Sequence, residues 1–455
     1  MQDVKPEKIP HTAALLPPIP DESLDQVLMN EFKQLNRLAN EAAAQKMLRV
    51  RPQLTAVGSA MSVLGLKNYT LLHAGPPFKD TKSLPKTIQS SIVLSAIYEG
   101  WANNELEVLA LLERGLIELK PAQDFRCVTP LAATISPKTS LLCVKDAKST
   151  LPACFAPLAS GPGADIRFGT NNPGVLSTLT LRDTLLTRAM MAVLKMPIEL
   201  FDFALLGLQG GDDLHSSTTA ATQALGQEIH TRLKQSSFAL DQTLVVEELI
   251  KSNPGFFLTP WMAACKLMLT SIEAIPFCSF ITRLGGNGQS MGLSTSQAPM
   301  QWLCQASTAP KGTRFVHAHP TVAIEAAVGD SCVIDAMGFG GQLINASPTV
   351  MQSLQPFCPQ DYATRSKKIM AMDHDHFNGS ILGPTEVAKD MKETKVRCGL
   401  DVLRIVELHC NPLINIAMLA NDGVSGLLGR GVYELDPVLS AQAATQLHTP
   451  DPSHL

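Results

Sequence analysis

Two carboxylates and a histidine stand together near the middle of the chain, in the stretch QGGDDLH that ends at residue 215. Asp212 or Asp213 could act with His215 to hydrogen-bond a substrate amide and to move a proton, which is general acid–base chemistry. The same residues have a structural interpretation, because an Asp that follows a Gly-Gly break commonly caps the next helix. Taken alone, the spacing favours the helix cap, with catalysis as the alternative.

Glycines recur in the stretch GVSGLLGRG, where Gly423, Gly426, Gly429 and Gly431 surround Arg430. Glycine lets a ligand approach the backbone closely, and successive N–H groups can form a nest for an anion. The spacing is neither that of a P-loop nor that of a dinucleotide-binding turn, and no acidic residue follows where such a turn needs one. The pattern alone therefore predicts a plain glycine-rich connection.

Two arginines lie beside apolar residues, Arg167 in RFG and Arg404 in LDVLRIVE. A guanidinium in such surroundings usually pairs with a carboxylate, and Asp401 or Glu407 could serve Arg404. Its fork of donors also fits a phosphate or the carboxylate of an α-keto acid. The sequence leaves both interpretations open.

Two further motifs carry weaker signals. GQSMG matches G-x-S-x-G with Ser290 as candidate nucleophile, but LSTSQAPM after it is a poor helix, and a nucleophile elbow needs strand, turn and helix. DHDHFNG places His374 and His376 at alternate positions, and HAHP contains His317. Without a third ligand of distinctive spacing, these histidines favour solvated turns over a metal site. We expect no metal and no cofactor.

The bulk properties are those of a globular protein. The chain has 455 residues, a net charge of −4, 17% charged residues and 45% hydrophobic residues. It has no basic run for nucleic acid, no run long enough to span a membrane and no signal peptide. Its ten cysteines include no C-x-x-C pair. These features predict a cytoplasmic protein with free thiols, which binds neither nucleic acid nor membrane.

Periodicity predicts an α/β fold in which mixed α/β domains flank a largely helical middle region. We divide the chain into a flexible arm (1–20), an N-terminal α/β domain (21–175), a helical region (176–276), a C-terminal α/β domain (277–440) and a tail (441–455). Helices are expected from residue 21 to about 42, at 90–103, 105–114, 359–371 and 436–447. Strands are expected at 69–72 and 139–146, and in FCSFITRL, QWLCQAS and DSCVID.

Several stretches, taken in order, resemble one family. They are LLHAGPP (71–77), EGWA (99–102), RFG (167–169), GDDLH (211–215), FFL with CK (256–266), GDS with GFGG (329–341), and GLDVLRIVE followed by PLIN and the closing glycines (399–431). The chain is similar to the large subunit of oxamate carbamoyltransferase from anaerobic allantoin catabolism, the AllG/YlbE type. The resemblance extends over roughly residues 70–435, and this chain is a divergent member.

The resemblance implies carbamoyl transfer between carbamoyl phosphate and an amide such as oxamate, with phosphate leaving. It also implies assembly, as a homo-oligomer, with companion subunits, or both. On this basis we assign Asp212, Asp213, His215 and Arg404 to catalysis. We assign the following residues to binding of the carbamoyl phosphate or phosphate and the small amide acceptor: His73, Gly75, Arg167, Asn287, Gly340, Gly341, Asn415, Gly429 and Gly431. Backbone N–H groups of GFGG and GVSGLLGRG are expected to point at the phosphate, with Arg404 as a fork.

The chain departs from the family at polar positions. Ser217 and Thr218 stand where the family has Arg-Asn, Gln123 and Asp124 stand for two histidines, and Thr259 stands for an asparagine. In addition, TPLAA replaces a glycine-rich stretch, and Ala159-Ser160 replaces Asn-Glu. Either the substrate differs or this subunit has lost part of the site and supports a partner. A non-catalytic structural subunit is therefore the main alternative function, and a serine hydrolase using Ser290 is a distant one.

Overall fold

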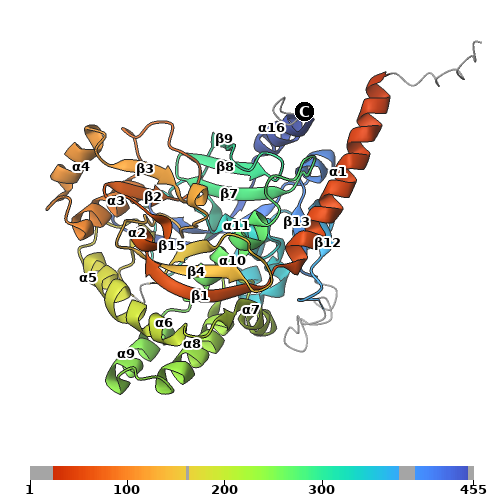
Figure 1. Ribbon diagram of the computed structural model, residues 1–455. Helices are drawn as coiled ribbons and strands as arrows, with labels where there is room; N and C mark the ends of the chain where they lie inside the picture. The colour runs from red at the N-terminus through yellow and green to blue at the C-terminus, as the bar shows by residue number, and fades with distance from the viewer. Residues whose placement is uncertain (1–23, 160–162, 379–394, 449–455) are drawn as a thin grey trace, which may run out of the picture.

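A computed structural model describes residues 24–159, 163–378 and 395–448. Helices and several small sheets are interleaved along the chain, so the predicted mixed α/β class is confirmed (Figure 1). The predicted arm lies outside the described residues, and so do residues 449–455 of the predicted tail. The tail's first part, residues 441–448, is not a tail but belongs to helix α16 (Pro437–His448).

A four-stranded antiparallel sheet of order β5-β4-β1-β6 forms the first part of the fold. Its strands are β1 (Pro52–Ser59), β4 (Ser140–Asp146), β5 (Cys154–Pro157) and β6 (Ile198–Glu199). Beside it, β2 (Thr70–His73) pairs in parallel with β3 (Glu118–Pro121), and the connection between them contains α3 (Lys86–Glu99) and α4 (Glu105–Glu113). The strands predicted at 69–72 and 139–146 are confirmed by β2 and β4, and the helices predicted at 90–103 and 105–114 by α3 and α4.

Helices dominate the middle of the chain. They are α5 (Gly174–Leu181), a π-helical turn η3 (Arg182–Leu186), α6 (Thr187–Val193), α7 (Leu200–Gln209), α8 (Thr219–Lys234), α9 (Leu240–Lys251) and α10 (Leu258–Thr270). The short strand β6 lies among them and pairs with β1, so this part is tied to the first sheet. The division into separate domains stays a prediction.

Two further sheets follow. The first has the order β11-β7-β8-β9, with β7 (Ile281–Asn287), β8 (Ser290–Thr295), β9 (Leu303–Ala306) and β11 (Val328–Gly329). The second has β15 (Leu427–Glu434) between β10 (Lys311–Arg314) and β14 (Leu413–Leu419). A two-stranded sheet joins β12 (Met370–Asp373) to β13 (Arg397–Leu400). The strands predicted from FCSFITRL and QWLCQAS are β7 and β9.

Two predictions in this region differ from the structure. The helix expected at 359–371 is limited to Arg365–Ile369, since Met370 already begins β12. DSCVID was expected to be a strand, but Cys332–Ala336 form the short helix α11. Every residue of α11 is buried, and a fully buried apolar run shows no periodicity that separates helix from strand. The remaining short helices are α2 (Ala60–Leu64), α12 (Pro348–Leu354), α13 (Arg365–Ile369) and α15 (Val402–Glu407).

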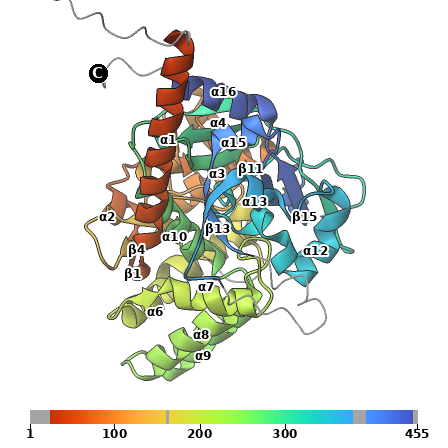
Figure 2. The ribbon, with the colours of Figure 1, turned by 90° about the vertical axis from the view of Figure 1, so that its right-hand side faces the viewer.

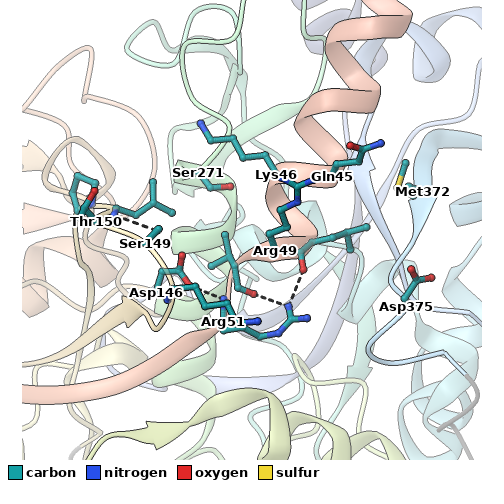
Figure 3. A pocket seen from close by; sticks show the side chains of 15 residues that line it. Gln45, Lys46, Arg49, Arg51, Asp146, Ser149, Thr150, Ser271, Met372 and Asp375 are labelled. Carbon is teal, nitrogen blue, oxygen red and sulfur yellow. Dashed lines mark hydrogen bonds between the residues drawn. The ribbon is translucent and has the colours of Figure 1, made fainter.

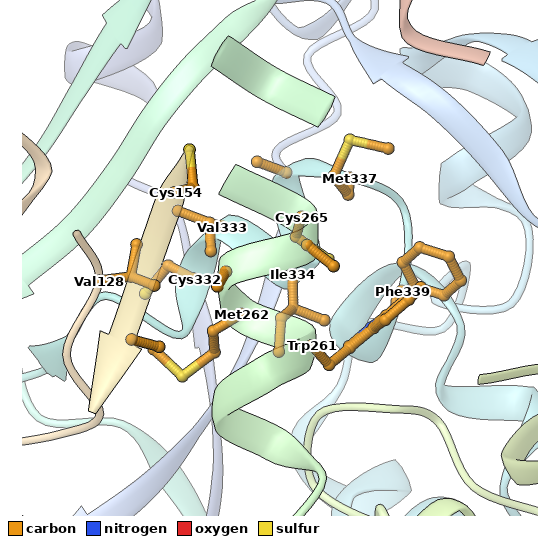
Figure 4. Packing of buried hydrophobic residues seen from close by; sticks show 14 of the residues in the cluster. Val128, Cys154, Trp261, Met262, Cys265, Cys332, Val333, Ile334, Met337 and Phe339 are labelled. Atoms are coloured by element: carbon orange, nitrogen blue, oxygen red, sulfur yellow. The ribbon is translucent and has the colours of Figure 1, made fainter. Parts of the chain in front are cut away.

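The core is continuous through most of the chain. Its largest apolar cluster includes residues from Ala43 to Ala444. Helix α10 lies at its centre, where Trp261, Met262 and Cys265 pack near α11 and β5 (Figure 4). Because nearly all of α10 is buried, it is apolar around its circumference, as helices inside a core are. This packing holds α11, which contributes to the site described below, in a fixed position.

The first helix, α1 (Leu24–Arg49), confirms the helix predicted from residue 21 to about 42 and continues beyond its predicted end to Arg49. From Phe32 onward it contacts the body, and its N-terminal end reaches past α16 (Figure 2). Leu28, Leu35 and Leu38 on this helix are about half exposed. Within the described residues, the helices are all too short or too polar to cross a membrane. The ten cysteines are unpaired, as expected.

Candidate functional site

A cavity of about 250 Å³ gathers segments that lie far apart in the sequence. Its cationic and imidazole groups are Arg167, His215 and Arg430. Hydroxyl groups come from Ser216, Ser217, Thr218, Thr219 and Ser331, and most of the other lining residues are apolar or glycine. Among its lining residues there is no Asp or Glu. The cavity therefore carries positive charge without a lining carboxylate to neutralise it.

His215 is held by a buried carboxylate behind the cavity wall. Its Nδ1 lies 2.9 Å from Oδ2 of Asp335, and both side chains are nearly inaccessible. Oδ1 of Asp335 accepts the backbone N–H groups of Gly341 (2.7 Å) and Asn415 (3.0 Å). Burial alone would lower the pKa of His215, but the neighbouring Asp335 outweighs burial and raises it. With Nδ1 directed at Asp335, Nε2 is the ring nitrogen left for a ligand.

Asp213 fixes the loop that carries His215. Its carboxylate accepts the backbone N–H groups of His215 (3.2 Å), Ser216 (3.2 Å) and Ser217 (2.7 Å), and the side-chain amide of Asn415 (2.6 Å). Asp212 accepts the Ser217 hydroxyl (2.8 Å) and the Ala221 N–H (3.0 Å) near the start of α8. Both carboxylates therefore hold the loop and the start of α8. Their predicted catalytic role is untested, and neither lines the cavity.

The glycines of GFGG do not present their N–H groups to the cavity. Gly340 (φ +56°) donates to the carbonyl of Asp213 (2.9 Å), and Gly341 donates to Asp335. A Cβ on Gly340 would lie 2.8 Å from Cβ of His215, and one on Gly341 would lie 2.2 Å from the carbonyl oxygen of Leu413. The expectation that these N–H groups point at a phosphate is therefore corrected: they position His215 and its partner. Asn415 acts in the same way.

The glycine run 423–431 is a turn followed by a strand. Gly423 and Gly426 have φ values of +72° and +69°, and the chain then enters β15. Gly429 and Gly431 lie in this central strand, which pairs with β10 and β14 on its two sides. Space there is limited, since a Cβ on Gly429 would lie 2.1 Å from the carbonyl oxygen of Thr313. The run is therefore not an anion nest, and its contribution is to bring Arg430 and Gly429 to the cavity.

Arg167 reaches the cavity from the turn η2 (Ile166–Phe168). Its Nε lies 3.3 Å from Oδ2 of Asp165, and its guanidinium lies 4.9 Å from the ring centroid of Phe168. In the parts of the chain that the structure covers, neither terminal nitrogen of Arg167 has a hydrogen-bond partner. These two nitrogens are the donors of the fork that fits a carboxylate or phosphate.

A second group of predicted residues, His73, Gly75 and Asn287, does not line the cavity. Gly75 donates its N–H to Asp330 (2.9 Å), and a Cβ there would lie 2.4 Å from the backbone of Gly286. Asn287 donates to the carbonyl of Pro76 (2.9 Å) and closes the β7–β8 turn. Burial lowers the pKa of His73 to about 4, so its imidazole is neutral at pH 7. Their predicted role in substrate binding is untested, and they pack behind the site.

Asp330 is the acceptor that holds Gly75 of this second group. It also accepts hydrogen bonds from the Gln123 amide (2.7 Å) and the Thr129 N–H (3.1 Å), and burial raises its pKa to about 7. Its chain neighbour Ser331 and the nearby Leu131 do line the cavity. Asp330 therefore supports the cavity wall from behind.

Arg404 lies elsewhere. Its Nε is 3.7 Å from Oδ2 of Asp401, its Nη1 donates to the carbonyl of Met370 (3.1 Å), and its side chain is 44% exposed. It lines a groove beside α1 together with residues such as Arg37 and Glu41. The structure therefore does not bring Arg404 to His215, and its contacts match the alternative of an internal pair with Asp401.

The weaker motifs have structural positions. Ser290 begins strand β8, so the residues after it form no helix, as expected. His374 is buried against Phe201 and Phe377, and the rings of His376 and Phe201 also meet. The groups of His, Cys, Asp and Glu seen in the described ranges do not form a cluster of three that could hold a metal.

A larger cavity lies elsewhere. A groove of about 870 Å³ lies between the end of α1 and the β4–β5 hairpin (Figure 3). Lys46, Arg49, Arg51 and Lys148 line it together with Asp146 and Asp375. Nη1 of Arg51 donates hydrogen bonds to the backbone carbonyls of Leu48 (2.8 Å) and Val50 (3.0 Å). The charges of this groove are mixed, and none of the predicted site residues lies in it.

Sequence reasoning therefore identified Arg167, His215 and Gly429 at the cavity and missed Asp335, Asp330 and Ser331. The missed residues all lie in GDSCVID, where two aspartates interrupt an otherwise apolar run. Aspartate is almost never fully buried without partners, so two of them in a run expected to be buried were the available signal.

Comparison with known proteins gives consistent relatives. Residues 117–331 match the family described as "Oxamate carbamoyltransferase subunit AllG". The protein of that name from Escherichia coli strain K12 is 26% identical over 430 residues, which cover 90% of this chain and 97% of that protein. The uncharacterized protein YahG of the same strain is 23% identical over 418 residues, covering 90% of this chain and 86% of its own length.

A solved structure has the same fold. It is a conserved protein of unknown function from Enterococcus faecalis V583, with a TM-score of 0.83 and 21% sequence identity, and the match covers 92% of this chain and 98% of that one.

Proposed function

This chain belongs to the AllG family of oxamate carbamoyltransferase subunits, and on that premise we propose that it transfers a carbamoyl group between carbamoyl phosphate and a small amide such as oxamate. The reacting site is the cavity lined by Arg167, His215 and Arg430. The relative from Escherichia coli is named as a subunit, and we extend this to a multi-subunit assembly for this chain.

The observation that carries the proposal is the charge of this cavity. Both arginines reach it, His215 lines it, and the carboxylates of Asp165, Asp213 and Asp335 lie outside its lining, where they contact Arg167, the loop of His215 and its ring. Anions such as a phosphate or the carboxylate of an α-keto acid fit a planar fork of N–H donors. The volume of about 250 Å³ suits small ligands.

His215 is the group that moves the proton. Bond formation between the amide nitrogen and the carbamoyl carbon releases an N–H proton, and cleavage of the carbon–oxygen bond to phosphate produces an oxyanion. Nε2 of His215 accepts the first proton and returns one to the departing phosphate, while Asp335 holds the ring and stabilises the imidazolium. The arginines balance the negative charge that develops on the phosphate.

Strained backbone at the cavity supports this assignment. Leu214, which precedes His215, has φ +64°, and Leu131 in the lining has φ +47°. Non-glycine residues in such conformations are costly and cluster at functional sites.

The test is release of phosphate from carbamoyl phosphate that depends on an amide acceptor, measured for the wild type and for His215→Asn. We expect the variant to lose a factor of about 10²–10⁴. Arg404→Lys is the control, and we expect it to keep its rate within a factor of about two. Equal rates for the wild type and His215→Asn would show that the cavity is not the reacting site.

A structural subunit is the second candidate. The observation that favours it is the N-terminal end of α1, where Leu28 and Met29 are 54% and 42% exposed. A single helix that leaves the body in this way gains little stability by itself and suits contact with another chain. A scaffold should bind companion subunits and be unaffected by carbamoyl phosphate, whereas the enzyme should bind both.

A further inference from the structure

Ser331 stands at a sharp turn between a strand and a helix. Strand β11 ends at Gly329, whose φ is +139°, and α11 begins at Cys332. The turn packs closely against another segment, because a Cβ on Gly329 would lie 3.0 Å from the backbone nitrogen of Leu131. This strand–turn–helix arrangement is the context that presents a nucleophilic serine in hydrolases, and Ser290 lacks it.

Ser331 and His215 line the same cavity, with 3% and 8% of their surfaces exposed. Asp335, which contacts Nδ1 of His215, lies four residues after Ser331, at the other end of α11. Residues four apart on a helix share a face, so Ser331 and the carboxylate that holds His215 are presented on one side of α11. The three residues are therefore an alcohol, an imidazole and a carboxylate arranged around one short helix.

The Ser331 hydroxyl is also free to react. Among the described residues it has no hydrogen-bond partner, and this includes His215. Catalytic hydrogen bonds are often long or absent until the substrate is bound, so the missing bond does not exclude the pair. Two other hydroxyls of the cavity are engaged: Ser217 donates to Asp212 (2.8 Å) and Thr218 donates to the carbonyl of Pro254 (3.0 Å).

We propose that Ser331 is the nucleophile of a two-step transfer, in which it carries the carbamoyl group as an ester between donor and acceptor. This inference rests on the proposed function. It adds a catalytic residue, a covalent intermediate and an order of events to that function.

In the first step, Oγ of Ser331 attacks the carbonyl carbon of carbamoyl phosphate, and Nε2 of His215 takes the hydroxyl proton. The bond from carbon to the phosphate oxygen breaks, and phosphate leaves with the electron pair and receives the proton from His215. In the second step, the amide nitrogen of the acceptor attacks the ester carbonyl and gives its proton to His215. The bond between carbon and Oγ then breaks, and Oγ regains a proton from His215.

The experiment exposes the chain to carbamoyl phosphate without an acceptor, quenches with acid and maps the modified peptide by mass. The wild type should carry one carbamoyl group on Ser331, and it should exchange labelled phosphate into carbamoyl phosphate. Ser331→Ala should lose the adduct and slow acceptor-dependent transfer by on the order of a thousandfold or more. Ser331→Cys should form a thioester-like adduct, which keeps the test valid if the alanine variant folds poorly.

Ser290→Ala is the matched control, because it removes the serine of the G-x-S-x-G sequence outside the cavity, and its adduct should be unchanged. A wild type that is stabilised by phosphate but forms no adduct and shows no exchange would overturn the nucleophile and leave the proposed function standing. A wild type that phosphate does not stabilise would overturn the proposed function itself. An adduct on a residue other than Ser331 would also overturn the inference.

Discussion

The small cavity at His215 and the large groove at the end of α1 both contain several cations, yet they are built differently. In the cavity, Arg167, Arg430 and His215 face a space without a lining carboxylate, and Asp213 and Asp335 support the loop and ring of His215 from behind. In the groove, which has more than three times the volume, Asp146 and Asp375 stand among the cations and Arg51 is bound to backbone carbonyls.

The difference shows that the placement of carboxylates identifies a site better than volume does. A carboxylate behind a wall orients a histidine and raises its pKa, whereas one in the wall competes with an anionic ligand for the same cation. The cavity has the first arrangement and the groove has the second. Substitutions made in pairs, one at the cavity and one away from it, test this contrast.

The largest effect is expected from Asp335→Asn. The change removes the negative charge at His215 and places an amide among the N–H donors of Gly341 and Asn415. Loss of one partner from a buried pair costs about 3–5 kcal/mol of unfolding free energy, and loss of the carboxylate in a similar dyad lowers the rate by on the order of 10⁴-fold.

The matched variant in the groove is Asp375→Asn, since Asp375 is exposed. Its unfolding free energy should stay within about 0.5 kcal/mol of the wild type. Chemical denaturation and the phosphate-release assay check both variants. Similar losses in the two variants would remove the distinction between the regions.

Gly340→Ala should have the next largest effect. Gly340 has φ +56°, and the new methyl group would lie 2.8 Å from Cβ of His215. Gly115→Ala is the control, because Gly115 has a similar φ of +66° but an added Cβ would meet nothing within 4 Å. In both variants the left-handed backbone should lower the unfolding free energy by about 1–2 kcal/mol.

Only Gly340→Ala should also displace His215 and reduce the transfer rate, by at least about tenfold. Unfolding midpoints and rates measured side by side separate the two effects. An active Gly340→Ala variant would mean that the ring position matters little.

The fold class and part of the cavity were predictable from the sequence. GDDLH and RFG contain residue types that can bind or transfer protons, although each also had a structural interpretation. The structure places His215 and Arg167 in the lining of the same cavity. The pattern of GVSGLLGRG predicted a plain connection, and the structure has a turn and a strand there. The anion-binding role that the resemblance implied for these glycines and for GFGG does not match their packing, because a sequence does not tell whether a glycine makes room for a ligand or for another strand. Only the structure supplies the neighbours, such as Thr313 beside Gly429.

The part that could not be predicted is centred on α11. Its residues are fully buried, so no polar face marked it as a helix, and the i, i+4 relation of Ser331 to Asp335 stayed hidden. The position of Arg404 could not be predicted for a related reason. The sequence around a partly buried arginine does not distinguish a ligand from a protein carboxylate as its partner, and here the neighbour is the carboxylate of Asp401.

A smaller effect is expected from pH at Asp330. Burial raises the pKa of this carboxyl from 3.8 to about 7. The folded state therefore holds the proton more tightly than the unfolded state, so this group's contribution to stability falls as pH rises from about 4 to about 7 and is constant above that.

Asp330→Asn removes this titration, although it also loses one acceptor for the N–H groups of Gly75 and Thr129. Relative to the variant, the wild type should lose on the order of 1–3 kcal/mol of unfolding free energy between pH 5 and pH 8. Urea denaturation at the two pH values measures the difference. A difference that is independent of pH would place the pKa of Asp330 outside this range.

The central claim is that the cavity at His215 binds an anion, and the most direct measurement is the shift of the thermal unfolding midpoint with phosphate and with carbamoyl phosphate. The wild type should be stabilised by about 2.7 kcal/mol when the ligand is at 100 times its dissociation constant. Arg167→Lys and Arg430→Lys should fold and lose most of this shift, because lysine does not reproduce the two parallel hydrogen bonds of a guanidinium. Arg404→Lys and Arg49→Ala should keep it. A shift that is absent from the wild type, or equally present in Arg167→Lys and Arg430→Lys, would contradict the claim.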